Sequence, residues 1–167
     1  MSETHKAIHD RKLKDIQRIF KKTLGFKNVS EINIPLPPSN QGDVDLICID
    51  SETLFYVEMK AGRGTKLSDF ERFLTKRHKD IATLNKNKII NEKIRRKKFF
   101  FFLPNSLSKV EEKIKEHLSH LPDRENIFVF RNLEYFEKLS NEVDPSYAKR
   151  ELFGELGIPP ANNENIE

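Results

Sequence analysis

Two stretches of sequence decide the fold: GDVDLICI at residues 42–49 and LFYVEMK at residues 54–60. Both are rich in β-branched, aliphatic and aromatic residues, which favour β-strands. The polar residues 50–53 between them make a short connection that is typical of a β-hairpin. The sequence therefore predicts two antiparallel strands, and the other elements can be placed around them.

The predicted turn determines which residues of the hairpin lie opposite each other. A two-residue tip and a four-residue loop at 50–53 give the same pairing, in which Asp45 faces Glu58 and Asp43 faces Lys60. Directly opposed residues share one face of a sheet, with side-chain roots about 5 Å apart. The pattern therefore predicts carboxylates and an ammonium group together at one end of the hairpin. A slip of two residues would put Asp43 in the place of Asp45.

Such a group of charges indicates a metal site. Two carboxylates at this distance repel each other unless a cation lies between them, and hard divalent cations prefer carboxylate oxygens. Lys60 beside the ion is suited to orienting a water or to stabilising charge that develops on a phosphate. Phe55, Val57 and Met59 alternate with these residues and are predicted to pack on the other face of the sheet.

Asp45 followed by Glu58-Met59-Lys60 resembles the bipartite motif of the PD-(D/E)XK nuclease superfamily, which includes restriction endonucleases and archaeal Holliday junction resolvases. The resemblance covers roughly residues 5–103 and implies a restriction-endonuclease-like fold. It implies that Asp45 and Glu58 bind Mg²⁺, with Mn²⁺ as a substitute, and that Lys60 assists the attacking water. The implied reaction is hydrolysis of a phosphodiester bond in DNA, with structured or branched DNA as one expected substrate.

Two positions depart from the pattern of the superfamily. The proline before the aspartate is Val44 here, and the first helix has no glutamate of the kind that many members use as a further metal ligand. His9 lies on the apolar face of that predicted helix and Asp15 lies at its edge, so both are accessory candidates for this role. Asp43 is a third accessory candidate, through the alternative register.

The hydrophobic periodicity of the rest of the chain predicts the remaining elements. Helices are expected at 5–24, in one or two pieces at 66–92, and at 106–121 and 133–139, and strands at 27–34, 98–103 and 127–130. This order predicts an α/β protein with a mixed central β-sheet flanked by helices and an αβββαβ core. Residues 1–156 are expected to form a single domain, and residues 157–167 have the composition of a disordered tail.

Charge is distributed in blocks along the chain. Residues 60–98 carry fourteen Lys and Arg against four acidic residues, residues 6–27 are also basic, and residues 28–59 contain six acids and no Lys or Arg. Basic segments on either side of an acidic one suit a polyanion bound next to a divalent cation. The side chains expected to contact the phosphates of DNA or RNA are Arg63, Lys66, Arg72, Lys76, Arg77 and Lys79.

The composition also bears on location. The single cysteine, Cys48, excludes an internal disulfide and suits a reducing compartment. No apolar run approaches the roughly 20 residues that a membrane helix needs, and no signal peptide is recognisable. A cytoplasmic protein that does not bind a membrane is expected.

Two other functions stay open at this level. The missing helix glutamate favours a catalytically inactive nucleic-acid-binding module on the same fold. The acidic residues 99–167 would instead suit a protein-interaction subunit of a repair or defence complex. A homodimer is expected if both strands of a duplex are cut symmetrically, since that needs two active sites.

Overall fold

The computed structural model describes residues 4–37, 42–50, 52–62, 64–90, 93–104 and 108–142. Its central sheet has five strands in the order β1 (Asn28–Val29), β4 (Leu46–Asp50), β5 (Thr53–Met59), β6 (Arg96–Phe102) and β7 (Ile127–Phe130). The β1–β4 and β4–β5 pairs are antiparallel, whereas β5–β6 and β6–β7 are parallel. The sheet is mixed, as predicted.

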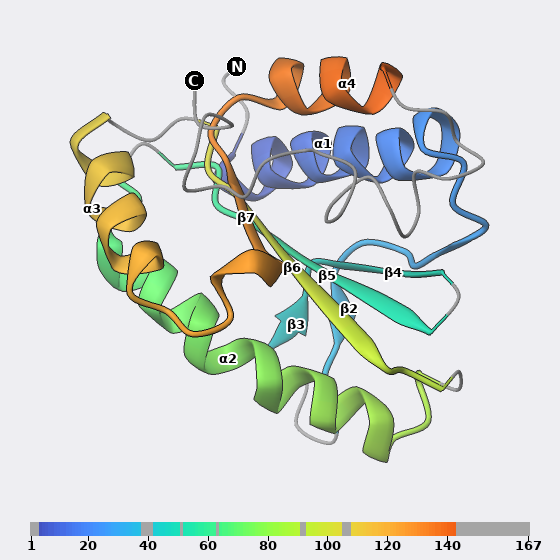
Figure 1. Ribbon diagram of the computed structural model, residues 1–167. Coiled ribbons are helices and arrows are strands. Elements are labelled where there is room, and N and C mark those ends of the chain that lie inside the picture. Colours follow the sequence, from blue (N-terminus) through green and yellow to red (C-terminus); the bar gives the residue numbers. More distant parts are fainter. Residues whose placement is uncertain are drawn as a thin grey trace.

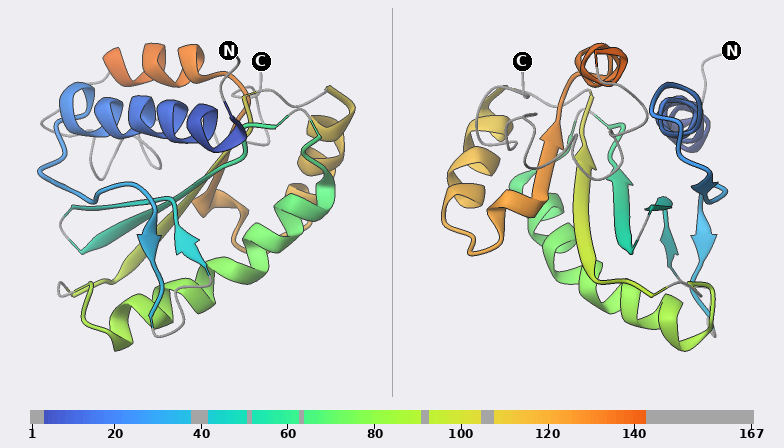
Figure 2. Two further views of the ribbon diagram at one scale, coloured as in Figure 1. Left: turned by 180° about the vertical axis from the view of Figure 1, so that it is seen from behind. Right: turned by 45° about the vertical axis from the view of Figure 1, so that its right-hand side comes forward.

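Helices cover both faces of this sheet (Figure 1). On one face lie α1 (His5–Arg18), its π-helical continuation η1 (Ile19–Thr23) and α4 (Leu133–Asn141); on the other lie α2 (Leu67–Lys86) and α3 (Ser108–Ser119). The short η2 (Arg124–Asn126) leads into β7. Figure 2 shows the same two helical layers from the other sides. The order α1, β1, β4, β5, α2, β6 confirms the predicted α/β class with its αβββαβ core.

The register of the central hairpin is the predicted one. Leu46 pairs with Val57, and Asp50 pairs with Thr53, which closes the hairpin with a two-residue tip. The first residue of that tip, Ser51, lies outside the described residues. Extending the same pairing by one residue places Asp45 opposite Glu58, so the alternative register shifted by two residues is wrong.

The predicted strand at 43–49 is divided into two. It splits into β3 (Asp43–Val44) and β4, with a bend at Asp45 between them. β3 pairs with β2 (Ile34–Pro35) in a separate two-stranded sheet, so the strand predicted at 27–34 is divided in the same way, into β1 and β2. The backbone N–H of Asn33, a residue with a φ of 58°, donates to the Asp45 carbonyl at 2.9 Å. Both segments therefore leave the central sheet at the same point, beside Asp45.

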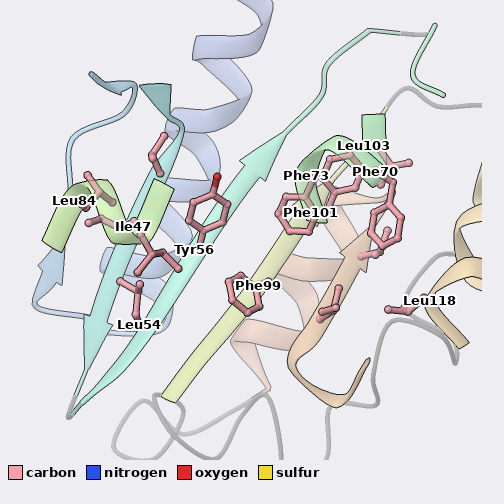
Figure 3. Packing of buried hydrophobic residues seen from close by; sticks show 14 of the residues in the cluster. Ile47, Leu54, Tyr56, Phe70, Phe73, Leu84, Phe99, Phe101, Leu103 and Leu118 are labelled. Carbon is pink, nitrogen blue, oxygen red and sulfur yellow. The ribbon is translucent and has the colours of Figure 1, made fainter. Parts of the chain in front are cut away.

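Two apolar cores lie on the two faces of the sheet. Every residue of β5 is buried, and its side chains alternate between the cores. Phe55, Val57 and Met59 pack in the core under α1 and α4, as predicted, while Tyr56 belongs to the core under α2 and α3 (Figure 3). Glu58 shares the face of Tyr56 and is therefore a carboxylate within a buried strand.

The ends of the helices differ modestly from the predicted ones. The first helix changes to a π turn after Arg18, and Gly25 follows with a φ of 71°, the left-handed conformation expected of a glycine stop. The segment predicted as one or two helices is the single helix α2. The predicted tail, 157–167, lies outside the described residues, and the extent of the domain stays a prediction. Within the described ranges, no helix is both long and apolar enough to cross a membrane.

Candidate active site

Asp45 lies where the chain bends from β3 into β4, and its side chain is held by the neighbouring strand. Its Oδ2 atom accepts a hydrogen bond from the backbone N–H of Met59 at 2.8 Å. The imidazole of His9, on α1, lies 3.3 Å from the same oxygen. Asp45 is only 8% exposed. Contacts from β5 and α1 therefore hold its carboxylate beside the end of β5.

Glu58 is the next-to-last residue of β5 and is 5% exposed. Its two carboxylate oxygens lie near two ammonium groups: Oε2 is 3.7 Å from Nζ of Lys60, and Oε1 is 3.4 Å from Nζ of Lys76. Burial raises the pKa of Glu58, as does the charge of Asp45, while the two lysines lower it less. A further cation in the pocket would favour the charged form of this carboxyl group.

The three residues predicted to be catalytic line one open cavity of about 370 Å³. Asp45, Glu58 and Lys60 come from the bend, from β5 and from the residue after β5. The backbone N–H of Lys60 donates to the Phe102 carbonyl at 2.8 Å, which fixes the chain at the edge of the cavity. The remaining lining residues are His5, Lys6, His9, Asp10, Asn33, Asp43, Met59, Ala61, Gly62 and Lys76.

Lys76 has a more central place than a phosphate contact on a helix surface. Its Nζ donates to the Asp43 carbonyl at 2.7 Å and lies 3.2 Å from the Asp80 carboxylate, in addition to its contact with Glu58. Burial alone would lower the pKa of Lys76, but the charges of Glu58 and Asp80 outweigh it and raise the pKa. Asp80 is itself buried and accepts a 2.6 Å hydrogen bond from the Tyr56 hydroxyl. This network fixes Lys76 beside Glu58.

Of the first helix, His9 and Asp10 line the cavity, whereas Asp15 does not. Asp10 lines the cavity, lies 3.0 Å from Nδ1 of His9 and accepts a hydrogen bond from the Asn33 amide at 2.9 Å. Asp15 is exposed and does not line the cavity, so its prediction as an accessory ligand is wrong. Five residues along a helix turn the side chain by about 140°, away from the cavity. In the sequence, the signal for Asp10 was its position directly after His9.

The carboxylates around His9 favour its protonated form. The hydrogen bond to Asp45 raises the pKa of His9 to about 9, against the lowering effect of burial and with the help of Asp10. His9 lines the cavity, and its role as an accessory metal ligand stays a prediction. Asp43, the other accessory candidate, lines the cavity from the small β2–β3 sheet.

Besides Lys76, which lies in the cavity, the other five of the six residues predicted to contact nucleic acid fall into three groups. Lys66, Arg72 and Lys79 are exposed on or beside α2, as the prediction requires. Arg77 is not: it is 6% exposed, lies 3.1 Å from Asp123 and stacks over the Phe99 ring at 4.5 Å. It is a structural residue, because it stands four positions after Phe73 and four before Ile81, on the buried face of α2. The sixth, Arg63, lies outside the described residues.

The donor set of the cavity is compatible with a magnesium ion. Among the described residues, no three His, Cys, Asp or Glu side chains lie close enough together to hold a metal between them. Mg²⁺ does not need such a cage, since it is commonly bound by one or two carboxylates and keeps waters and substrate phosphates as its other ligands. Asp45 and Glu58 supply two hard oxygen donors in one cavity.

The fold and cavity thus define an α/β protein that has a mixed five-stranded sheet, an αβββαβ core and a carboxylate–lysine site. No protein-family model and no curated protein matches the sequence. Among solved structures, the chain is similar to the small subunit (R.BspD6I2) of the heterodimeric restriction endonuclease R.BspD6I, with 14% identity over 86% of this chain and 77% of that chain and a TM-score of 0.49. It is also similar to a repair endonuclease from Pyrococcus abyssi, with 14% identity over 79% of this chain and 48% of that one and a TM-score of 0.40.

Both of these proteins are named as endonucleases. At this identity the similarity concerns the fold alone.

Proposed function

We propose that this protein is a metal-dependent endonuclease that hydrolyses phosphodiester bonds in DNA. The observation that carries the proposal is the convergence of two buried carboxylates, Asp45 and Glu58, with the Lys60 ammonium in one open cavity. Carboxylates are costly to bury without a cation. A cavity that combines them with lysines suits an anionic substrate that arrives with a divalent ion.

Asp45 and Glu58 are the residues that would hold the ion, Mg²⁺ or in its place Mn²⁺. When bound, the ion supplies Lewis acidity toward the phosphate and neutralises part of its charge. The protein prepares the two ligands in different ways. The N–H of Met59 orients Asp45 through the 2.8 Å hydrogen bond, and the lysines on either side of Glu58 keep its carboxylate aimed into the cavity.

Lys60 is the residue placed to act on the reacting groups. Its side chain is 36% exposed, so the ammonium reaches the open part of the cavity while its backbone is fixed to β6. There it can donate a hydrogen bond to the attacking water or to a phosphate oxygen that gains charge during the reaction. Water adds to phosphorus and the bond to one ester oxygen breaks, which leaves a phosphate and a hydroxyl end on the cut strand.

The test is a cleavage assay on linear duplex, single-stranded and four-way-branched DNA. Cutting that requires Mg²⁺ or Mn²⁺ and stops with EDTA is the expected result. A preference for the branched substrate would indicate a resolvase-like enzyme. Cuts at symmetric positions on both strands of a duplex would indicate the proposed homodimer. An RNA duplex in the same assay decides between the two nucleic acids.

A catalytically inactive binding module is the second candidate. It is favoured by the missing glutamate of the first helix, where the imidazole of His9 lies 3.3 Å from the Asp45 carboxylate. Salt-sensitive DNA binding without cleavage of any of the three substrates would establish this function in place of the first.

Replacing Lys76 with methionine is expected to slow cleavage about tenfold, equivalent to about 1.4 kcal/mol of transition-state stabilisation. The change keeps the aliphatic stem but removes the ammonium that contacts Glu58 and Asp80. The measurement is the single-turnover cleavage rate at saturating protein, with circular dichroism to check the fold. Lys113→Met, at an exposed position of α3, is the matched control. A rate equal to that of the control would show that Lys76 has no role in the site.

A further inference from the structure

A second group of cations lies away from the cavity, where α2 ends and β6 begins. We call it the distal basic surface. It consists of six exposed residues: Lys86, Lys88, Lys93, Arg95, Arg96 and Lys97. Two of them contact polar side chains of the hairpin: Arg95 lies 3.1 Å from Glu52, and Arg96 donates to the Thr53 hydroxyl at 3.3 Å. Among the described residues, the acidic side chain in contact with this surface is that of Glu52, which offsets only part of the positive charge.

This surface lies at the opposite end of the sheet from the cavity. Arg96 is paired with Thr53, the first residue of β5, whereas Glu58 is paired with Phe101, near the far end of β6. Five residues of strand separate the two pairs, which corresponds to about 17 Å. Figure 1 shows α2 running along the sheet between these two ends. A ligand that touches both places must therefore be extended.

Lysines on α2 connect the two places. Lys76, Lys79 and Lys86 fall within a sector of about 80° around the helix axis and span about 15 Å along it. Lys79 and Lys86 are exposed, and Lys76 is the lysine whose ammonium lies in the cavity beside Glu58. The acidic residue nearest this sector, Asp80, is 3% exposed and bound to Tyr56 and Lys76, so it does not face a ligand. The cations form one row from the cavity to the distal basic surface.

We propose that this row and the distal basic surface bind a DNA arm that extends from the cut site along α2 and beyond its C-terminal end. The inference rests on the proposed function, and adds which part of the substrate the protein holds. A row of lysines without base-reading geometry contacts the phosphate backbone and is indifferent to sequence. At 3.4 Å per base pair, the arm reaches the surface after about five base pairs and covers it with about ten.

The test compares two triple variants that remove the same charge. Lys86→Gln, Lys93→Gln and Lys97→Gln alter the distal basic surface and leave the paired arginines in place. Lys109→Gln, Lys113→Gln and Lys138→Gln alter exposed lysines of α3 and α4. Binding of a fluorescent DNA duplex of about 20 base pairs is measured without divalent metal over a range of salt concentrations. This readout does not depend on cleavage.

The distal variant is expected to bind more weakly than the control, and the slope of log K against log salt is expected to fall by about 2 to 3. On a duplex of about four base pairs on either side of the cut, too short to reach the surface, the two variants should bind equally. In cleavage, the distal variant should have a raised KM on the long substrate with an unchanged kcat.

Equal binding and equal salt slopes of the two triple variants on the long duplex would overturn the inference. A loss of binding affinity that is as large on the short duplex as on the long one would overturn it too. The surface would then act through the net charge of the protein and not through contact with the DNA arm. The proposed function fails on a different result, namely wild-type protein that binds the long duplex and never cuts it. In that case the length-dependent effect on binding would still hold.

Discussion

Replacing Glu58 with glutamine is expected to reduce DNA cleavage about a thousandfold, a loss of about 4 kcal/mol of transition-state stabilisation. Glutamine has the same shape but no negative charge, so the proposed pair of metal ligands would keep only the carboxylate of Asp45. The ammonium groups of Lys60 and Lys76 would also lose the carboxylate between them. The cleavage rate is to be measured with Mg²⁺ and with Mn²⁺, and Mn²⁺ binding by calorimetry.

The fold is expected to tolerate this change. Glu58 is 5% exposed, and a neutral amide is less costly to bury than a charge, so the unfolding temperature should stay within a few degrees of the wild-type value. Glu71→Gln, at an exposed position of α2, is the matched control and should cleave normally. A Glu58→Gln variant that is folded, loses no Mn²⁺ affinity and cuts at the wild-type rate would remove Glu58 from the site and with it the proposed function.

The register of the central hairpin could be predicted from the sequence because the burial of its strands allows few alternatives. Every residue of β5 is buried, so a shift by one residue would exchange its two faces and bring Glu58 into the apolar core under α1. The alternation of Phe55 and Val57 with Tyr56 was therefore sufficient to predict which face carries the acidic residues. The pairing of Asp50 with Thr53 then follows from the short turn.

The structural features that the sequence did not predict depend on contacts between segments that are distant in the sequence. Nothing in the run from Asp43 to Ile49 signals the bend at Asp45, because the bend arises when β3 pairs with β2 instead of β5. The helix α2 is different. Its apolar residues Phe73 and Ile81 stand four positions before and after Arg77 and so place Arg77 on the buried face, a pattern that is overlooked when residues are grouped by charge alone.

The two lysines beside Glu58 are held in different ways, which suggests different roles. Lys76 is engaged by the Asp43 carbonyl and by Asp80, so its ammonium is fixed toward the protein. Lys60 is fixed through its backbone, and its ammonium lies at 3.7 Å from Glu58, a looser contact. A group that must interact with a changing substrate benefits from the second arrangement. We therefore expect the loss of Lys60 to affect chemistry more than the loss of Lys76.

Lys60→Met is accordingly expected to lower the single-turnover cleavage rate about a hundredfold, or about 2.7 kcal/mol, with DNA affinity changed by much less. The methionine keeps the stem that packs beside the cavity, and the backbone hydrogen bond to Phe102 is unaffected. Lys27→Met, at an exposed position after α1, is the matched control. Lys60→Arg retains the charge in a different shape and should recover part of the rate.

The ratio of the rate loss to the affinity loss decides between the two roles open to Lys60. An ammonium that acts only in the transition state lowers the rate and leaves binding intact, whereas one that merely holds a phosphate weakens both equally. If Lys60→Met loses affinity and rate by the same factor, Lys60 is a binding residue and the water must be activated without it. If the variant cleaves like Lys27→Met, the resemblance of Glu58-Met59-Lys60 to the nuclease motif is limited to its carboxylate.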